Sequence, residues 1–251
     1  MPLIVPAESK NNLLAKALLS IPMEERLILG LSLSRIRLAA GAPVFDGEID
    51  RVLFLEKGIA AETIHTSGGN ALGISIIGRE GAVGLRGMIS GARGFEARAL
   101  TPLEAIQISA RALKLACSRS RELEKLLRNY SDLLLQDSIV TLACHYYHSI
   151  DKRLPRWLLM AASRLGSNRL PFTQEVLAET HGVTPGAISM VLDALESNGL
   201  VERARKEIIV LDRGRLLRKA CRCYSTRSTG HRDLNRENSR EERRNVQIEN
   251  A

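Results

Sequence analysis

The feature that most constrains the fold is the run TQEVLAETHGVTPGAISMVLDALESNGLV at residues 173–201. Thr173 can cap a short helix that ends at Gly182, because glycine adopts the left-handed conformation at little cost. Thr184 can cap a second helix that begins at Pro185, where the missing N–H costs nothing. Both helices carry apolar residues at helical spacing, which we expect to face inward: Val176, Leu177, Ala178, Ile188, Val191, Leu192 and Leu195. The tight turn between the two helices predicts a helix-turn-helix.

A two-stranded hairpin with a basic turn is predicted directly after these helices. Residues 200–203 and 207–211 have the pattern of short strands, and Ala204-Arg205-Lys206 forms the turn between them. This order is typical of a winged helix, in which the second helix enters the major groove of DNA and the wing contacts phosphates. We therefore expect DNA contacts from the following residues: Thr173, Gln174, Thr184, Pro185, Gly186, Ser189, Met190, Arg203, Arg205 and Lys206.

The charge of the chain favours an anionic partner. The formal net charge is +8. The excess of Lys and Arg over Asp and Glu is 2 in residues 1–150 (17 against 15), 5 in residues 151–224 (13 against 8) and 1 in residues 225–251 (6 against 5). The positive charge is therefore concentrated in the segment that contains the predicted winged helix, where a phosphate-binding surface is expected.

Residues 41–109 contain short β-rich runs separated by glycines. The runs are residues 52–55, 59–64, 74–77 and 105–109. Short strands at intervals of roughly ten residues, with glycine turns, predict a small antiparallel roll or sandwich. Upstream, leucines at helical spacing on both sides of Pro22 predict two short helices within residues 11–35.

A long amphipathic helix is predicted from residue 119 to residue 150. Its apolar positions form a wide stripe: Leu123, Leu126, Leu127, Tyr130, Leu133, Leu134, Ile139, Val140, Ala143 and Tyr147. Such a stripe can pack against its own domain on one flank and against a second copy of the chain on the other. We therefore expect a homodimer that charge at Leu134 would break, with Asp137 on or beside the seam. The alternative is a helix that packs only within its own monomer.

Two runs in the C-terminal half, LPRWLLMAASRLGSNRLPFTQEVLAETHGV and ISMVLDALESNGLVERARKEIIVLDRGRLLRKACRCY, resemble the Crp/Fnr family of bacterial transcription regulators, especially the subgroup common in rhizobia. RVLFLEKGIA resembles the strand-Gly-strand hairpin of the cyclic-nucleotide-binding-like fold, and IIGREGAVGL resembles the glycine-rich turn of that subgroup. The resemblance covers about residues 11–224. It implies a homodimer that binds pseudo-palindromic, double-stranded operators, with RNA polymerase as a further partner.

The patterns and the resemblance together predict an α+β chain. A jelly-roll-like, cyclic-nucleotide-binding-like sensor domain is expected over residues 11–118, a dimerisation helix over 119–150 and a winged helix-turn-helix over 151–224. Residues 225–251 are polar and mixed in charge, which predicts a disordered tail.

The chain departs from cyclic-AMP-binding members of the family at their ligand positions. Those members carry a Gly-Glu pair for the ribose and an Arg-Ser pair for the phosphate, whereas here Gly84 precedes Leu85 and Arg93 precedes Gly94. The ribose carboxylate is missing, so we expect no cyclic AMP binding and leave the small-molecule effector open, with Arg93 as a weak candidate contact. Fnr-type oxygen sensors place the cysteine ligands of an iron–sulfur cluster near the N-terminus. No cysteine precedes Cys117 here, so we expect no cluster of that kind.

The recognition helix departs from the family as well. Well-known members expose Arg and Glu near its start and Arg one turn later, which suit guanine and cytosine edges. The corresponding residues here are Pro185, Gly186 and Met190, and none makes a bidentate hydrogen bond. With Thr184 and Ser189 as the remaining hydroxyl partners, we expect an operator that is A·T-leaning or weakly specified. The alternative is a sensor that signals through protein contacts and has lost DNA binding.

The chain lacks the groups of residues that characterise the enzyme classes a β-roll could suggest. A metal-dependent cupin needs about three converging His or Glu ligands, and the predicted roll contains only His65 as a histidine. No grouping of nucleophile, base and orienting residue is visible, so we expect no catalytic residues.

Metal and membrane sites are not expected either. The four cysteines (Cys117, Cys144, Cys221 and Cys223) lack a paired C-x-x-C spacing, and we expect inert thiols with no metal or other cofactor. His145 and His148 could begin a metal site but have no clear partners in the sequence. No apolar run is long enough to span a bilayer and the N-terminus lacks the pattern of a signal peptide, which predicts a cytoplasmic protein.

Overall fold

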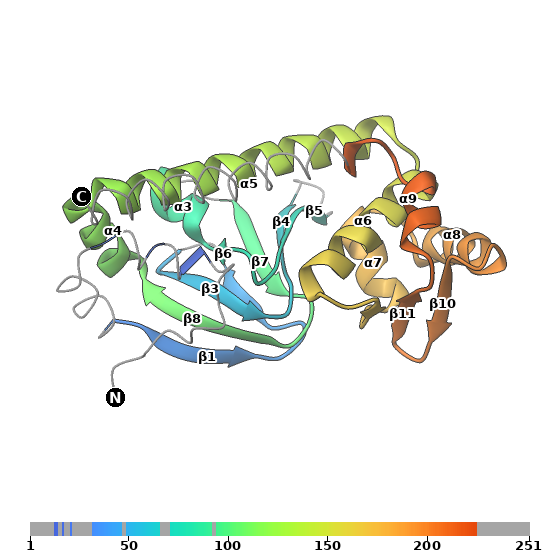
Figure 1. Ribbon diagram of the computed structural model, residues 1–251, viewed down its shortest axis with the longest axis horizontal. Helices are drawn as coiled ribbons and strands as arrows, with labels where there is room; N and C mark the ends of the chain where they lie inside the picture. Colours follow the sequence, from blue (N-terminus) through green and yellow to red (C-terminus); the bar gives the residue numbers. More distant parts are fainter. Residues whose placement is uncertain are drawn as a thin grey trace, which may run out of the picture.

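The computed structural model describes residues 32–46, 49–65, 71–91 and 94–224, together with residues 13, 14, 17 and 21. The strands of the N-terminal half are β1 (Ser34–Leu38), β2 (Pro43–Asp46), β3 (Arg51–Lys57), β4 (Ala60–His65), β5 (Ala71–Ile77), β6 (Ala82–Val83), β7 (Phe95–Ala99) and β8 (Leu103–Ser109). They form two four-stranded sheets in the orders β1-β8-β3-β6 and β2-β7-β4-β5. Every pairing is antiparallel, which confirms the predicted antiparallel roll (Figure 1).

The link between β3 and β4 passes from one sheet to the other. β3 pairs with β6 and β8, whereas β4 pairs with β5 and β7. The expectation that RVLFLEKGIA forms a hairpin is therefore wrong, because its two strands do not pair. Gly58 makes the sharp turn with φ 87°, and a Cβ there would lie 2.3 Å from the carbonyl oxygen of Pro102. Only glycine fits this turn.

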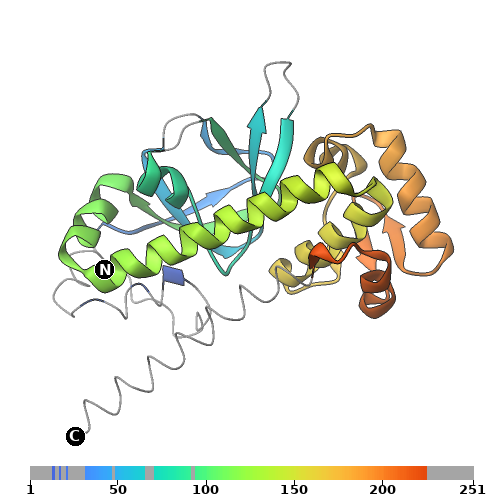
Figure 2. The same ribbon diagram turned by 90° about the horizontal axis from the view of Figure 1, so that it is seen from above.

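Within the continuously described segments, the helices beside the roll are α3 (Leu85–Ser90), α4 (Ala110–Arg119) and α5 (Arg121–Tyr147). The sequence predicted the long helix α5 but not α3 or α4. Ser120 separates α4 from α5, because its backbone is extended and its Oγ accepts a hydrogen bond of 3.2 Å from the Leu123 N–H. α5 runs along the whole roll and reaches the C-terminal domain (Figures 1 and 2).

The two flanks of α5 have different surroundings. One flank is buried in the hydrophobic core of the roll and contains Leu123, Leu127, Tyr130 and Leu134. The other flank exposes large apolar side chains, namely Leu135, Ile139, Leu142 and Tyr146, which we call the outer stripe. Leu134 is only 1% exposed and Asp137 only 5%. The expectation that these two residues lie at a dimer seam is therefore wrong, because both are buried within the monomer.

The C-terminal domain consists of α6 (Ile150–Leu165), β9 (Arg169–Leu170), α7 (Gln174–His181), α8 (Pro185–Ser197), β10 (Val201–Ala204), β11 (Glu207–Val210) and α9 (Arg213–Lys219). Its strands form a small sheet in the order β10-β11-β9. The Trp157 and Phe172 rings meet edge to face at 4.9 Å in a core that also takes in Ile59, Ala61 and Ile76 from the roll. The domain therefore packs directly against the roll.

Several of the segments discussed in the sequence analysis lie partly or wholly outside the described residues. Most of residues 11–35 lies outside the described residues, although positions 13, 14 and 17 are helical and the chain is already in β1 from Ser34. Arg93 and residues 225–251 lie outside them entirely. None of the helices in the described part of the chain has the length and apolarity that crossing a membrane requires.

Candidate nucleic-acid interface

The helix-turn-helix is capped as its sequence predicts. Thr173 Oγ1 accepts a hydrogen bond of 3.4 Å from the N–H three residues later, and Gln174 beside it is half-buried. Gly182 ends α7 with φ 62°. Thr184 Oγ1 accepts a 3.3 Å hydrogen bond from the Ala187 N–H at the start of α8. These caps fix the turn between the helices, and therefore the orientation of α8 relative to α7.

The outer face of α8 is apolar or uncharged over its first turns. Pro185 and Gly186 are exposed, Ser189 is half-buried, and Met190 is 74% exposed. The helix contains no Lys or Arg, and its first charged residue is Asp193. An exposed methionine next to a hydroxyl suits the methyl group of thymine better than the acceptor-rich edge of guanine.

Arg203 on the wing is held by two carboxylates of α8. Its Nη2 lies 2.6 Å from Asp193 Oδ1 and 2.7 Å from Glu196 Oε2, and its backbone N–H donates to Glu196 Oε1 at 2.8 Å. The hydrogen bonds from the backbone and side chain of Arg203 lower the pKa of Glu196. The wing is thereby fastened to α8, and the charge of Arg203 is balanced within the domain.

The tip of the wing carries two cations that are free to contact DNA phosphates. Arg205 and Lys206 are exposed, and neither forms an ion pair with any residue that the structure describes. Lys206 has φ 62°, so the turn holds a side chain in the left-handed region. Sequence reasoning did not single out α9, where further exposed cations lie: Arg213, Arg215, Arg218 and Lys219. Arg215 Nη2 donates to the Asn198 carbonyl at 3.0 Å, which links α9 to the end of α8.

A buried ion pair lies in the roll beside α3. Arg86 Nη2 lies 3.3 Å from Glu62 Oε2 and donates to Ser138 Oγ at 3.0 Å. Ser75 Oγ donates to Glu62 at 3.0 Å, and the guanidinium lies over the Phe95 ring. Burial raises the pKa of Glu62, while Arg86 and Ser75 oppose that rise. Arg86 directly follows Leu85, the position at which the family resemblance would place a ribose-binding carboxylate.

Isothermal calorimetry with cyclic AMP should therefore give no heat of binding at micromolar ligand. Leu85 is fully buried and offers no carboxylate acceptor for the ribose hydroxyl. A cyclic-AMP-binding relative run in parallel is the positive control. Micromolar binding to this chain would contradict the expectation.

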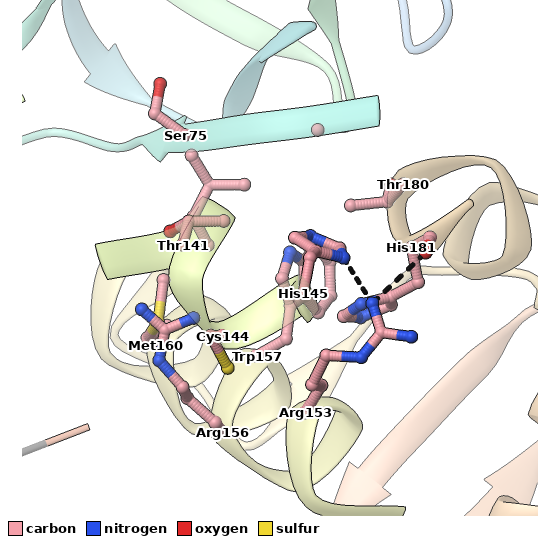
Figure 3. A pocket seen from close by; sticks show the side chains of 12 residues that line it. Ser75, Thr141, Cys144, His145, Arg153, Arg156, Trp157, Met160, Thr180 and His181 are labelled. Atoms are coloured by element: carbon pink, nitrogen blue, oxygen red, sulfur yellow. Dashed lines mark hydrogen bonds between the residues drawn. The ribbon is translucent and has the colours of Figure 1, made fainter. Parts of the chain in front are cut away.

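A small cavity lies where the roll meets the C-terminal domain, between β5, α5, α6 and α7 (Figure 3). Arg153 Nη1 contacts His145 Nδ1 and donates to the His181 carbonyl at 3.3 Å. Burial, followed by the charges of Arg153 and Arg156, lowers the pKa of His145 to about 4. Burial, followed by electrostatic interactions with His145, Arg153 and Arg156, holds the pKa of His181 well below its usual range. The cavity holds about 20 Å³, enough for a water molecule but not for a metabolite.

The structure also brings together three cysteines that were expected to be inert and His148, for which the sequence offered no clear partners. Cys144, His148, Cys221 and Cys223 place their sulfur and nitrogen atoms within 4.8 Å of one another at the end of α5. The group has no paired C-x-x-C spacing, because it combines Cys144 and His148, four residues apart at the end of α5, with a C-x-C segment far along the chain.

Comparisons with known proteins match this architecture. The family model for a Crp-like helix-turn-helix domain matches residues 152–219. No curated protein matches the sequence significantly.

Three solved structures are similar over most of their length. A transcriptional regulator assigned to the Crp/Fnr family from Eubacterium rectale has 19% identity and a TM-score of 0.65, over 79% of this chain and 94% of that chain. FixK2 from Bradyrhizobium japonicum has 14% identity and a TM-score of 0.66, over 75% and 98%. TTHB099, a regulator of the CRP family from Thermus thermophilus, has 18% identity and a TM-score of 0.62, over 74% and 96%. At these identities the likeness shows the fold, and the domain match adds the DNA-binding module. The chain thus shares the fold of these regulators and carries a Crp-like helix-turn-helix domain at residues 152–219.

Proposed function

We propose that the chain binds a pseudo-palindromic operator as a homodimer joined through α5. The observation that carries this proposal is the outer stripe, in which four large apolar side chains recur at spacings of four, three and four residues along one face: Leu135, Ile139, Leu142 and Tyr146. Their side chains are between 40% and 82% exposed in the monomer. This spacing is that of a coiled-coil seam, and a second copy of the helix would cover it.

Sedimentation of the purified chain tests this proposal. The chain should sediment as a dimer without DNA, and two protomers should bind one operator. A two-fold symmetric dimer matches two half-sites about one helical turn apart, roughly 34 Å. A monomer that still binds a palindrome tightly would refute the dimer.

The proposed division of the chain follows the packing. The roll and the inner flank of α5 share one hydrophobic core, and residues 151–224 form a second core with a few side chains from the roll. We propose the roll of residues 11–118 as the sensor domain, residues 119–150 as the dimerisation helix and residues 151–224 as the DNA-binding domain. The C-terminal motifs and the similarity to FixK2 favour the rhizobial-type subgroup. RNA polymerase is the proposed protein partner, and a small-molecule effector would act through the roll.

We also propose that α8 reads its operator through Thr184, Ser189 and Met190, while cations of the wing bind phosphate. Met190 is the most exposed apolar side chain on α8 and would contact a thymine methyl group. With no bidentate donor at the start of α8, the operator is A·T-leaning, and much of the affinity is electrostatic.

Replacing Met190 with alanine should change which base is preferred at one position of each half-site. We expect discrimination at that position to fall about fivefold, or ~1 kcal/mol, because one apolar base contact is lost. Competition between operator variants measures this, and the dependence of affinity on salt should stay unchanged. A guanine requirement that survives changes at Thr184, Ser189 and Met190 would show that other residues read the bases.

A further inference from the structure

Four potential metal ligands meet at the junction of α5 and the C-terminal end of the DNA-binding domain. Cys144 lies on α5, His148 follows the last residue of that helix, and Cys221 and Cys223 lie in the segment after α9. Cys144 Sγ lies 3.4 Å from Cys221 Sγ, and Cys223 Sγ lies 3.8 Å from His148 Nδ1. The two pairs come from positions 77 and 75 residues apart in the sequence. Figure 1 shows the chain after α9 returning to the end of α5.

These distances fit one tetrahedral ion. A zinc ion binds sulfur at about 2.3 Å and nitrogen at about 2.0–2.1 Å, so its ligand atoms lie roughly 3.5–3.8 Å apart. The two measured separations lie close to that range, and all four donor atoms fall within 4.8 Å of one another. Three thiolates and one imidazole are a ligand set that favours zinc over oxygen-seeking cations such as magnesium or calcium.

We propose that Cys144, His148, Cys221 and Cys223 bind one zinc ion, which ties the C-terminal end of the DNA-binding domain to the end of the long helix. The thiols give up their protons to solvent as they coordinate the metal. Cys144 and Cys221 are buried at 1% and 7% exposure, while His148 and Cys223 are half-buried and leave a path for the ion to enter.

A buried arginine supplies the charge that such a site needs. Three thiolates and a zinc ion have a net charge of −1, counting +2 for the metal. Arg156 is only 3% exposed, and its Nε and Nη2 atoms have no hydrogen-bond partner among the described residues. Its positive charge acts on all three cysteines of the group, and Figure 3 shows it next to Cys144. An unpaired buried guanidinium is costly, and an anionic metal site beside it would offset that cost.

The backbone already holds both ligand-bearing segments in place. The His148 N–H donates to the Cys144 carbonyl at 3.1 Å, which holds the backbone of His148 against the last turn of α5. The Cys221 N–H donates to the Lys152 carbonyl at 3.2 Å, and the Tyr224 N–H donates to the Cys221 carbonyl at 3.2 Å. The ligands are therefore positioned before an ion arrives. Zinc would then limit movement of the DNA-binding domain against α5.

Metal titration of the full-length chain with reduced thiols tests the site. One zinc ion should bind per chain, and cobalt in its place should give the absorption bands of a tetrahedral thiolate site. Cys223→Ser and His148→Ala change half-buried ligands, so both variants should fold. Each should lose more zinc affinity than the roughly 10–100-fold that loss of an outer-shell partner costs. Cys117→Ser, at a half-buried cysteine on α4, is the matched control and should bind zinc like the wild type.

Three results would overturn the zinc site: no stoichiometric zinc, equal loss of zinc affinity in Cys117→Ser, or a Cys144–Cys221 disulfide in place of the metal in freshly purified protein.

The effect of zinc on the DNA-binding domain rests on the proposed function and is measured separately, as operator affinity with and without a zinc chelator. We expect affinity to fall at least tenfold without zinc. Unchanged affinity in a zinc-binding chain would refute the tie to the DNA-binding domain, whereas a zinc-binding chain with no DNA affinity at all would refute the proposed function and leave the site intact.

Discussion

Replacing Ile139 with glutamate should turn a dimeric chain into a monomer and remove operator binding at the same time. Ile139 is 57% exposed in the middle of the outer stripe, so the monomer tolerates a charge there. In the dimer, the same carboxylate would be buried against its own copy in the facing helix. We expect dimerisation to weaken roughly 100-fold, which corresponds to about 2.8 kcal/mol. Sedimentation equilibrium measures the dimer, and a gel-shift assay measures operator binding.

The matched control is Gln136→Glu, an equal gain of charge at an exposed position of α5 beside the outer stripe. It should leave both the dimer and DNA binding close to those of the wild type. Leu134→Glu does not serve as a test of the dimer, because Leu134 lies in the core of the roll and a charge there would unfold the domain. If Ile139→Glu remains a dimer, the outer stripe is not the interface.

Removing both cations at the tip of the wing should weaken binding to all DNA sequences alike. Arg205 and Lys206 are exposed and have no ion pair in the described part of the chain, so both are available for phosphate. Each phosphate contact contributes about 0.9 to the slope of log affinity against log salt. The double variant Arg205→Ala/Lys206→Ala should therefore flatten this slope by about 1.8 and leave the base preference unchanged. Fluorescence anisotropy over a salt series measures both quantities.

The control removes the same amount of charge from the roll. Arg37→Ala/Lys57→Ala changes two exposed cations on β1 and β3, and it should alter the salt slope much less than the wing variant. Arg203→Ala should also change the slope little, because Asp193 and Glu196 already balance its charge. Equal slopes for wild type and wing variant would show that the wing tip does not contact phosphate.

Local signals in the sequence were sufficient for the DNA-binding domain. The caps at Thr173 and Thr184, the left-handed Gly182 and the hairpin around Arg205 all lie where the sequence predicts them. Each depends on a hydrogen bond or backbone preference within a few residues. The short helix α3 and the separation of α4 from α5 were not predicted, because packing on the roll determines where these short helices form.

Contacts between distant segments could not be read from the sequence. Helical spacing revealed the apolar stripe of α5, but it could not decide which flank faces the roll, so Leu134 was placed at the wrong surface. For the same reason, the ion pairs of Arg203 with α8 were not foreseen. The cysteine and histidine group was missed because folding brings Cys144 and Cys221 together across two domains.

Selection of bound fragments from the host genome, with and without cell extract, tests most directly whether the chain is an operator-binding regulator. We predict that the purified chain retains fragments sharing one two-fold symmetric, A·T-leaning motif, with half-sites about one helical turn apart. Fragments retained only in the presence of extract would add a small-molecule requirement to this account. Retention of no fragments under either condition, or of fragments that share no symmetric motif, would contradict it.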